Sequence, residues 1–160
     1  MQMPSSISTR LQYQHKSLID IIEGLSDEQI RLAMVPGKWS IFENIVHLQT
    51  YQHAMINRIK RILEEDEPVF DRYTAEADPL FHDNLTKSSR EIIHDLLTTR
   101  KEMSAGILSF KETDLDRKGS HPLYGKMTVV QWLNFFLLHE AHHLFTILKL
   151  TPGLRQVSGQ

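Results

Sequence analysis

The stretch that decides the fold is "WLNFFLLHEAHHLFTILKL", residues 132–150. Written as a helix, it is apolar around most of its circumference, and its polar side chains form a narrow strip: Gln131, Asn134, His142 and Lys149. A helix with so little polar surface belongs in the centre of a protein. "TVVQ" has the form of a capping box, and Pro152 follows the last apolar residues. We therefore predict a central helix over residues 128–150.

Three further long helices are expected from apolar periodicity, over residues 8–24, 40–65 and 85–110. The second opens with "SIFE", a capping box in which the serine caps the helix and Glu43 reaches back. A short helical turn, "SDEQIRLA", follows the first. Breaker-rich stretches separate these segments: "VPGKW", "DEPVF", "ADPLF", "KGSHPLYGK" and "TPG". No segment shows the strict alternation of a half-buried strand, so the sequence predicts an all-α fold, a four-helix bundle.

Length and composition indicate one ordinary globular domain over residues 1–160, with 41% hydrophobic and 24% charged residues. The net charge of −2 gives no reason to expect a nucleic acid or a membrane surface as partner. The sequence contains no cysteine, which excludes disulfides, thiolate ligands and cysteine nucleophiles. The first residues, "MQMPSSISTR", lack the apolar stretch of a signal peptide, so we expect a cytoplasmic protein.

Two histidines of the central helix, His139 and His143, project away from its polar strip. They are four residues apart, so their rings lie on one face and can converge on one point. An imidazole in an apolar interior needs a partner, because an unpaired buried polar group is costly. The pair therefore indicates a shared metal ion, and the alternative is a metal-free pair of core histidines.

The stretch "HEAHH", residues 139–143, also matches the H-E-x-x-H motif of zinc proteases. Those enzymes take a third ligand from downstream of the motif. Here the remaining chain, "LFTILKLTPGLRQVSGQ", has no His, Asp, Glu or Cys, and no edge strand is predicted to hold a peptide. A protease is thus disfavoured, and any third ligand comes from upstream.

A di-iron carboxylate site is a second alternative, because "EIIH" (Glu91, His94) and "EAHH" (Glu140, His143) both fit the Glu-x-x-His pattern. However, Glu91 and His94 lie opposite the apolar stripe of their helix. The additional glutamates that such a site needs on two other helices are not evident. The sequence therefore fits a di-iron carboxylate site poorly.

His47 is the best upstream candidate for the third ligand. It lies on a line with Glu43 and Tyr51, away from the main apolar face of its helix, which runs through Ile41, Ile45, Ile56 and Ile59. A helix in a bundle touches two neighbours, so a second inward line is possible, and periodicity leaves the question open. His15 is expected in the core or beside the site. The remaining histidines rank lower: His53, His82, His94, His121 and His142.

Two stretches, "PGKWSIFENIVHL" and "HPLYGKMTVVQWLNFFLLHEAHHLFTI", resemble the DinB-like (DinB/YfiT-like) superfamily in sequence, spacing and order. The resemblance covers nearly the whole chain. It implies a four-helix bundle of DinB-like connectivity with one divalent metal held by three histidines, which here are His47, His139 and His143. One departure is visible, since many relatives carry a glutamine shortly after the last histidine, where this chain has "LFTI".

Three neutral imidazoles leave a metal its full charge and an open coordination position, which is the layout of a catalytic site. Such an ion lowers the pKa of a bound water or thiol. The resemblance implies a small-molecule enzyme: a transferase that joins a low-molecular-weight thiol to an electrophile, or a hydrolase or isomerase of thiol conjugates. The thiol must arrive as a cosubstrate. Zinc or nickel is expected, with iron or manganese as alternatives, because imidazole discriminates poorly.

Glu140 is the candidate catalytic carboxylate, either as a base or as a partner that orients a ligand imidazole; the alternative is a partly exposed glutamate. For Glu43 we favour the capping box, for Tyr51 core packing, and for Trp39 a staple over the bundle end. The second functional hypothesis is a non-catalytic metal-binding or stress-associated bundle, whose ion would be sealed by a fourth ligand. A homodimer formed through the bundle faces suits either hypothesis.

Overall fold

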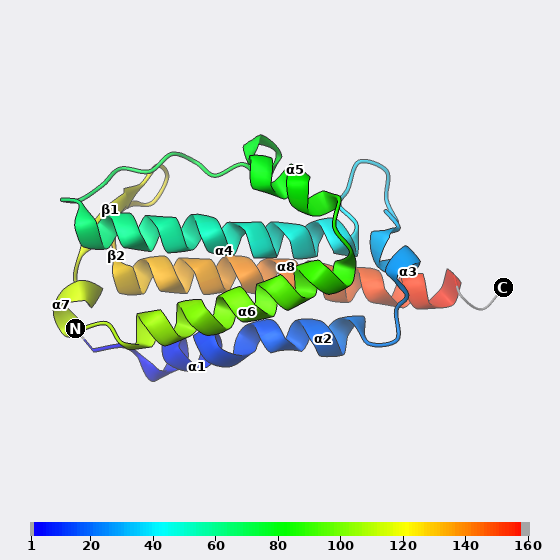
Figure 1. Ribbon diagram of the computed structural model, residues 1–160, viewed down its shortest axis with the longest axis horizontal. Coiled ribbons are helices and arrows are strands. Elements are labelled where there is room, and N and C mark those ends of the chain that lie inside the picture. The colour runs from blue at the N-terminus through cyan, green and yellow to red at the C-terminus, as the bar shows by residue number, and fades with distance from the viewer. Residues whose placement is uncertain (1, 158–160) are drawn as a thin grey trace.

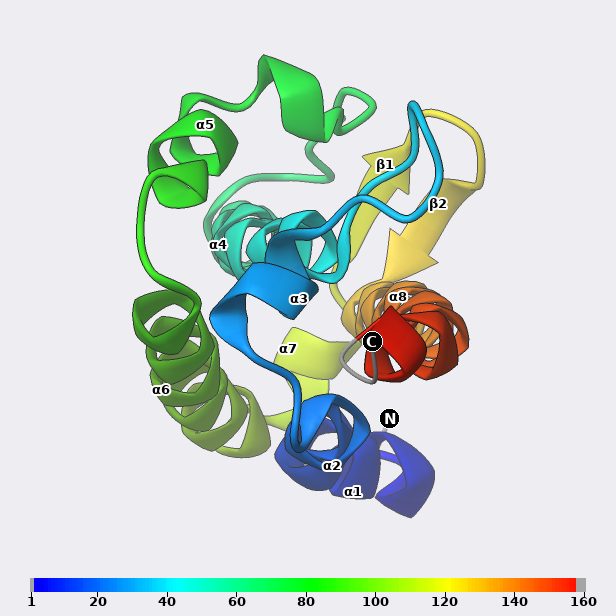
Figure 2. The ribbon, with the colours of Figure 1, turned by 90° about the vertical axis from the view of Figure 1, so that its right-hand side faces the viewer.

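The computed structural model describes residues 2–157, which form a four-helix bundle (Figure 1). The four helices of the bundle are called columns here, because the first of them is made of three consecutive elements. It consists of α1 (Ser5–Tyr13), the 3-10 turn η1 (Gln14–Lys16) and α2 (Ser17–Ile22). The other three columns are α4 (Ile41–Glu64), α6 (Ser89–Leu108) and α8 (Val129–Val157). Seen along the bundle, the columns occupy four corners, and α4 packs against both α6 and α8 (Figure 2). The predicted all-α bundle is confirmed.

The direction of the columns is unusual, because α4 and α6 run the same way, opposite to α1–α2 and α8 (Figure 1). The chain must therefore return along the bundle between α4 and α6. It does so through residues 65–88, which carry the 3-10 turn η2 (Ala75–Ala77) and the short helix α5 (Pro79–Leu85). Figure 2 shows this connection outside α4, on the side away from α1–α2.

Three helices of the structure begin directly after a serine that caps them. The capping box predicted at Ser40 is present, with Glu43 bonded back to the Ser40 amide at 2.7 Å. A similar box at Ser26 opens α3 (Asp27–Arg31), the short turn expected there. A third box, formed by Ser88, starts α6 and separates it from α5. The single helix predicted over residues 85–110 is therefore wrong at its start, because Ser88 caps a separate helix that begins at Ser89.

The predicted end of the last helix is also wrong, since α8 continues through Pro152 to Val157. A proline inside a helix removes one backbone donor. Here the exposed side of α8 tolerates the loss, because Leu148, whose carbonyl would accept that bond, is 48% exposed. Beyond the proline, Leu154 is fully buried and its carbonyl accepts a bond from Gln29 at 2.8 Å. The packing of Leu154 therefore outweighs the hydrogen bond that is lost at Pro152.

A two-stranded antiparallel hairpin precedes α8, where no strand was expected. It pairs β1 (Lys118–His121) with β2 (Gly125–Thr128). Gly125 has a φ of +70°, which favours glycine, and His121 Nδ1 accepts the amides of Leu123 and Tyr124 in the turn. Strands of four residues are too short to show an alternating pattern, which explains why periodicity missed them.

One face of α8 is open to solvent, so the helix is less central than its narrow polar strip predicted. The exposed face carries large apolar side chains as well as the polar strip: Leu138 at 57%, Phe145 at 60% and Leu148 at 48% exposure. A bundle of four columns gives each helix an outer side, which explains the difference. Each helix within residues 2–157 is too short or too polar to span a lipid bilayer.

A layer of polar side chains crosses the core between two apolar clusters. On each column the polar residue lies between a residue of one cluster and a residue of the other: His15 between Leu11 and Leu18, Gln52 between Leu48 and Met55, Arg100 between Leu96 and Met103, and Glu140 between Leu137 and Leu144. Arg100 and Glu140 are 1% and 2% exposed. The layer thus places an ion pair at the centre of the bundle.

The polar layer satisfies its own hydrogen bonds. The Arg100 guanidinium donates to both carboxylate oxygens of Glu140, and its Nε donates to Gln52 Oε1 at 2.7 Å. Gln14 Nε2 donates to Glu140 Oε1 at 2.9 Å. Buried charges are tolerated only when they are paired and hydrogen-bonded, as they are here.

We predict that Glu140→Gln destabilises the protein by about 3 kcal/mol, because it leaves the Arg100 charge buried without its counter-ion. The double variant Glu140→Leu/Arg100→Met should cost less than either single change, since it removes both charges. Urea unfolding measures these differences. Glu64→Gln, which removes half of an exposed pair with Lys60, serves as the control. A single-variant cost as small as that of the control would contradict the prediction.

Candidate metal centre

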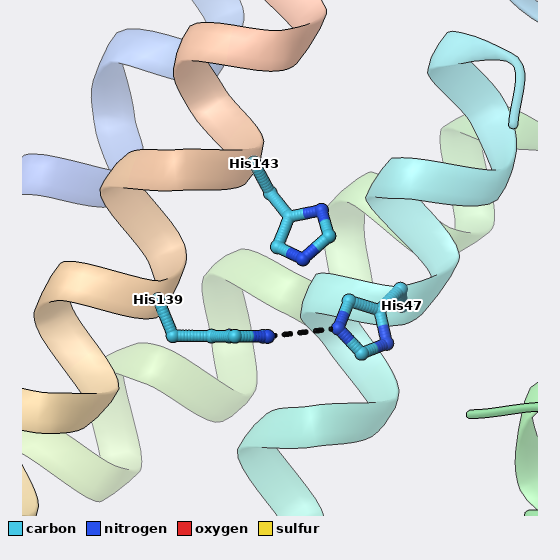
Figure 3. A group of neighbouring side chains, drawn as sticks. All are labelled: His47, His139 and His143. Carbon is cyan, nitrogen blue, oxygen red and sulfur yellow. Dashed lines mark hydrogen bonds between the residues drawn. The ribbon is translucent and has the colours of Figure 1, made fainter. Parts of the chain in front are cut away.

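Three imidazoles meet where α4 packs against α8. His47 comes from α4, and His139 and His143 come from successive turns of α8 (Figure 3). One ring nitrogen from each histidine lies within 4.8 Å of the other two. The Nε2 atoms of His47 and His139 are 3.0 Å apart. The structure therefore brings together the three residues that the resemblance implied.

Burial keeps these imidazoles neutral. His47 is 5% exposed, and His139 and His143 are partly buried. Burial lowers the pKa of His47 to about 4, against a smaller opposing effect of the Glu76 charge. Burial, followed by the neighbouring histidines, lowers the pKa of His139 and of His143 to about 3. At neutral pH all three rings present lone pairs, which a metal ligand requires.

Asn44 fixes the orientation of His143. Its Nδ2 donates to the Ser40 carbonyl at 2.8 Å, so its Oδ1 is left to accept from His143 Nδ1, also at 2.8 Å. His143 then carries its hydrogen on Nδ1 and presents the lone pair of Nε2. A partner that sets the tautomer of an imidazole in this way is typical of metal sites.

The remaining nitrogens fit one divalent ion. At metal–nitrogen distances of about 2.0–2.1 Å, tetrahedral ligands lie about 3.3 Å apart, close to the separation of His47 and His139 Nε2. The Nδ1 atoms of these two histidines are buried and have no hydrogen-bond partner within residues 2–157. If both Nε2 atoms hold an ion, the hydrogens sit on Nδ1, and the ion lies between two Nε2 lone pairs that would otherwise repel one another. The donor set is that of a zinc-type site.

The cluster lines a pocket of about 440 Å³, a volume suited to a small molecule. The pocket lies between α4, α8, the α4–α6 connection and the β-hairpin. Its lining residues include Tyr51, Arg58, Tyr73, Glu76, His121 and Phe135. Figure 2 shows the connection and the hairpin on the same side of the α4–α8 pair. Among the described residues the cluster holds three ligand side chains and no fourth, and all three histidines line the pocket.

Several aromatic rings pack directly on the imidazoles, and those of Trp39 and Tyr51 come nearest. The Trp39 ring lies 5.1 Å from that of His47 and 6.1 Å from that of His143, between centroids. The tryptophan expected to act as a staple therefore covers the cluster. Tyr51 is 3% exposed and its ring lies 4.3 Å from that of His139. The core packing predicted for Tyr51 is present, and the same side chain lines the pocket.

Glu140, the candidate catalytic carboxylate, points away from the cluster. It is buried in the polar layer, bonded to Arg100 and Gln14. Among the contacts of the described residues, none joins Glu140 to the three imidazoles. Glu43 closes the capping box, as favoured from the sequence. Neither carboxylate is therefore placed to act at the cluster.

Among the described residues, no other histidine joins the three-histidine ligand cluster. His15 is buried in the polar layer, 3.5 Å from Arg100, which confirms it as a core residue. His142 and His53 are exposed, as expected for residues outside the site. His94 shares no cluster with a second carboxylate within the described residues, and Glu91 instead closes the Ser88 cap. The di-iron alternative thus finds no support.

Three residues of the site were missed from the sequence. Asn44 lies one turn before His47 on the same helix, and that spacing was a usable signal. Arg58 is 7% exposed and Tyr73 is partly buried in the pocket wall. No sequence signal pointed to either, because an arginine in a helix normally lies at the surface and Tyr73 belongs to an irregular connection.

A family model and two related proteins were found by comparison with known sequences, and they agree with one another. Residues 10–147 match the family model described as the DinB superfamily. YuaE of Bacillus subtilis (strain 168) is 32% identical over 137 residues, covering 77% of this chain and 83% of that protein. OB0782 of Oceanobacillus iheyensis, named for an inferred metal-dependent hydrolase activity, is 28% identical over 129 residues, covering 79% of this chain and 73% of its own.

Solved structures share the fold. YfiT from Bacillus subtilis, described as an inferred metal-dependent hydrolase with an unusual four-helix bundle topology, superposes with a TM-score of 0.77 at 19% identity. The match covers 96% of this chain and 86% of that one. The DinB-like protein YjoA from Bacillus subtilis gives 0.63 at 17% identity, covering 96% and 93%. Similarity at this level of identity shows the bundle alone.

The lowered histidine pKa values predict how the metal-free protein responds to acid. The imidazoles of His15, His47, His139 and His143 titrate near pH 3 to 4 when folded but near 6.5 when unfolded. Between these values the unfolded chain binds more protons, so stability falls as the pH is lowered. Each such group contributes at most about 1.4 kcal/mol per pH unit.

Urea unfolding in the presence of a chelator at pH 7, 6 and 5 measures this slope. Carboxylates titrate mostly below this window, so histidines dominate it. His143→Gln should make the slope shallower, and His53→Gln, a change at an exposed histidine, should leave it unchanged. Equal stability of the metal-free protein at pH 7 and pH 5 would rule out neutral buried imidazoles.

Proposed function

The chain belongs to the DinB superfamily, and on this premise we propose that it is a metal-dependent enzyme acting on a small molecule. The reaction we propose is hydrolysis or a thiol-dependent S-transfer. His47, His139 and His143 would hold one divalent ion, with zinc or nickel as the first candidates and iron or manganese as alternatives.

The observation that carries this proposal is the pocket that reaches the three imidazoles. A purely structural ion is normally closed off by four protein ligands, whereas a catalytic ion keeps a position for substrate. Within the described residues the cluster offers three ligands and opens into about 440 Å³ of space. Access therefore favours an enzyme over a non-catalytic metal-binding bundle.

When bound, a divalent ion supplies a Lewis acid that lowers the pKa of a nucleophile such as water or a thiol. The residues of the chain then position the ion and the substrate. Asn44 holds the His143 ring, and Trp39 and Tyr51 exclude water from the faces they cover. The name of OB0782 supports hydrolysis. Because the chain lacks cysteine, a thiol would enter as a cosubstrate.

A homodimer is part of the same proposal. The exposed apolar side chains of α8, Leu138, Phe145 and Leu148, form a face that a second copy could cover. This face lies on the outer side of the helix that carries His139 and His143, so dimerisation would leave the bundle interior unchanged. Sedimentation velocity of the purified protein would determine the assembly state.

The first test is metal analysis by plasma mass spectrometry on untagged protein. We expect about one equivalent of a divalent metal per chain, lost in His47→Ala because two imidazoles hold an ion far less tightly than three. His53→Ala, a change on the same helix outside the cluster, is the matched control and should retain the metal. Metal retained in His47→Ala would mean that another residue is the third ligand.

If the wild-type protein takes up no metal, even after reconstitution, the hypothesis of a metal-dependent enzyme is refuted. If metal binds, the loaded enzyme can be screened with ester and amide substrates and with thiol–electrophile pairs. Turnover that depends on an added thiol would select S-transfer, and turnover in its absence would select hydrolysis.

A second prediction concerns Asn44. Asn44→Ala should weaken metal binding by roughly 10- to 100-fold, because His143 loses the partner that fixes its tautomer. Asn44→Asp keeps an acceptor at this position and should lose less. Competition with a chromophoric chelator measures the affinity, and Asn57→Ala, an exposed site on the same helix, is the control. Equal affinities of the Asn44→Ala variant and wild type would contradict this role.

A further inference from the structure

Within residues 2–157 two arginines are buried, and one of these two has a carboxylate partner. Arg100, 1% exposed, is paired with Glu140. Arg58, on α4, is 7% exposed, and within residues 2–157 no carboxylate lies at ion-pairing distance from it. A buried charge is costly unless an opposite charge and hydrogen bonds compensate for it. Arg58 therefore stands out as a buried cation whose neighbours are neutral acceptors and aromatic rings rather than a carboxylate.

The neighbours of Arg58 satisfy it only in part. Its Nη1 donates to Tyr51 Oη at 3.3 Å and its Nη2 donates to the Asp71 carbonyl at 2.9 Å. Its guanidinium also lies 5.4 Å from the centroid of the Trp132 ring. A guanidinium has five N–H donors, and these contacts use two. Both acceptors are neutral, so the positive charge and part of the donor capacity remain available.

Arg58 lines the same pocket as the three imidazoles. Tyr51 connects the two, since its ring packs at 4.3 Å on His139 while its hydroxyl accepts the bond from Arg58. The other charged lining residues are Arg72 and Glu76, and both are exposed. The buried part of the pocket therefore carries a fixed positive charge one tyrosine ring away from the ligand cluster.

We propose that Arg58 binds a carboxylate of the substrate, which thereby places its reactive group at the three-histidine cluster. A planar guanidinium matches a carboxylate through two parallel hydrogen bonds. A single buried cation balances a carboxylate, which carries one negative charge, better than a dianionic phosphate. The ligand class is thus a small carboxylic acid that fits within the pocket. This inference rests on the proposed function, because the cluster defines the reacting end.

A structural role for Arg58 has to be separated from this one, because its bond to the Asp71 carbonyl also ties the α4–α6 connection to α4. A tether would not distinguish a carboxylate from an uncharged amide of the same shape. The deciding quantity is therefore the preference for a charged ligand over its neutral isostere, measured as a ratio of dissociation constants.

The experiment uses protein loaded with Co²⁺, whose visible absorption reports on its ligands. The probes are mercaptocarboxylates of increasing chain length, each compared with the corresponding mercaptoamide. In the wild type, at the chain length that spans the site, we expect the carboxylate to bind roughly 10-fold or more tightly than its amide. Arg58→Gln should abolish this ratio without changing amide binding, and Arg58→Lys should retain part of it.

Arg61→Gln is the matched control, because Arg61 lies on the same helix but is paired with Glu65 outside the pocket. It should preserve the full ratio. No carboxylate preference in the wild type at any chain length would overturn the inference while leaving the metal site intact. A preference that persists in Arg58→Gln would also overturn it and would assign anion binding to another residue.

Failure of Co²⁺ to bind would refute the proposed function instead, and anion binding would then be measured without metal. Butyrate and butyramide can be titrated into the metal-free protein while the Arg58 Nε–Hε resonance is followed by NMR. A saturable shift with butyrate alone would support the carboxylate site, and no shift would exclude it. Should Arg58→Gln fail to fold, the ratio retained in Arg58→Lys decides, since a tether without charge recognition predicts none.

Discussion

The ion pair between Arg100 and Glu140 is the constraint on which the rest of the bundle depends. It fixes the rotation of α8, because Glu140 must face Arg100 inside the polar layer. In a helix of 3.6 residues per turn, His139 and His143 then lie about 100° and 60° away, on one side of Glu140. That side faces α4 and His47 (Figure 3). A buried salt bridge is weak evidence for added stability, but it is well suited to specifying one arrangement of helices.

Much of the bundle could be predicted from the sequence, because long amphipathic segments and capping boxes are local signals. The start of α4 at Ile41 behind Ser40 is an example. The failures have tertiary causes. Leu154, buried against the first column and α3, carries α8 past a proline that would end an isolated helix. The hairpin before α8 depends on a turn closed by the His121 side chain, which no periodicity reveals.

The candidate site was predicted only in part from local patterns, because some of its residues are placed by tertiary contacts. His139 and His143 followed from spacing on one apolar helix, whereas His47 lay off the apolar face expected for α4 and was identified by resemblance. The structure explains the difference: α4 packs against α6, α8 and α5, so its buried surface wraps around much of the helix. Ile56, placed on the expected face, is 37% exposed. The burial of Arg58 depends on its contact with the α4–α6 connection, and no local sequence pattern predicts that contact.

The parallel course of α4 and α6 has a consequence for how such proteins can diverge. It requires a long connection, and here that connection, residues 65–88, forms one wall of the pocket while the bundle holds the ligand histidines. The entropic cost of closing a loop rises only slowly with its length, and surface segments accept changes that a core does not. One half of the pocket can therefore vary while the other half stays fixed. A single bundle could in this way acquire many substrates without rebuilding its metal centre.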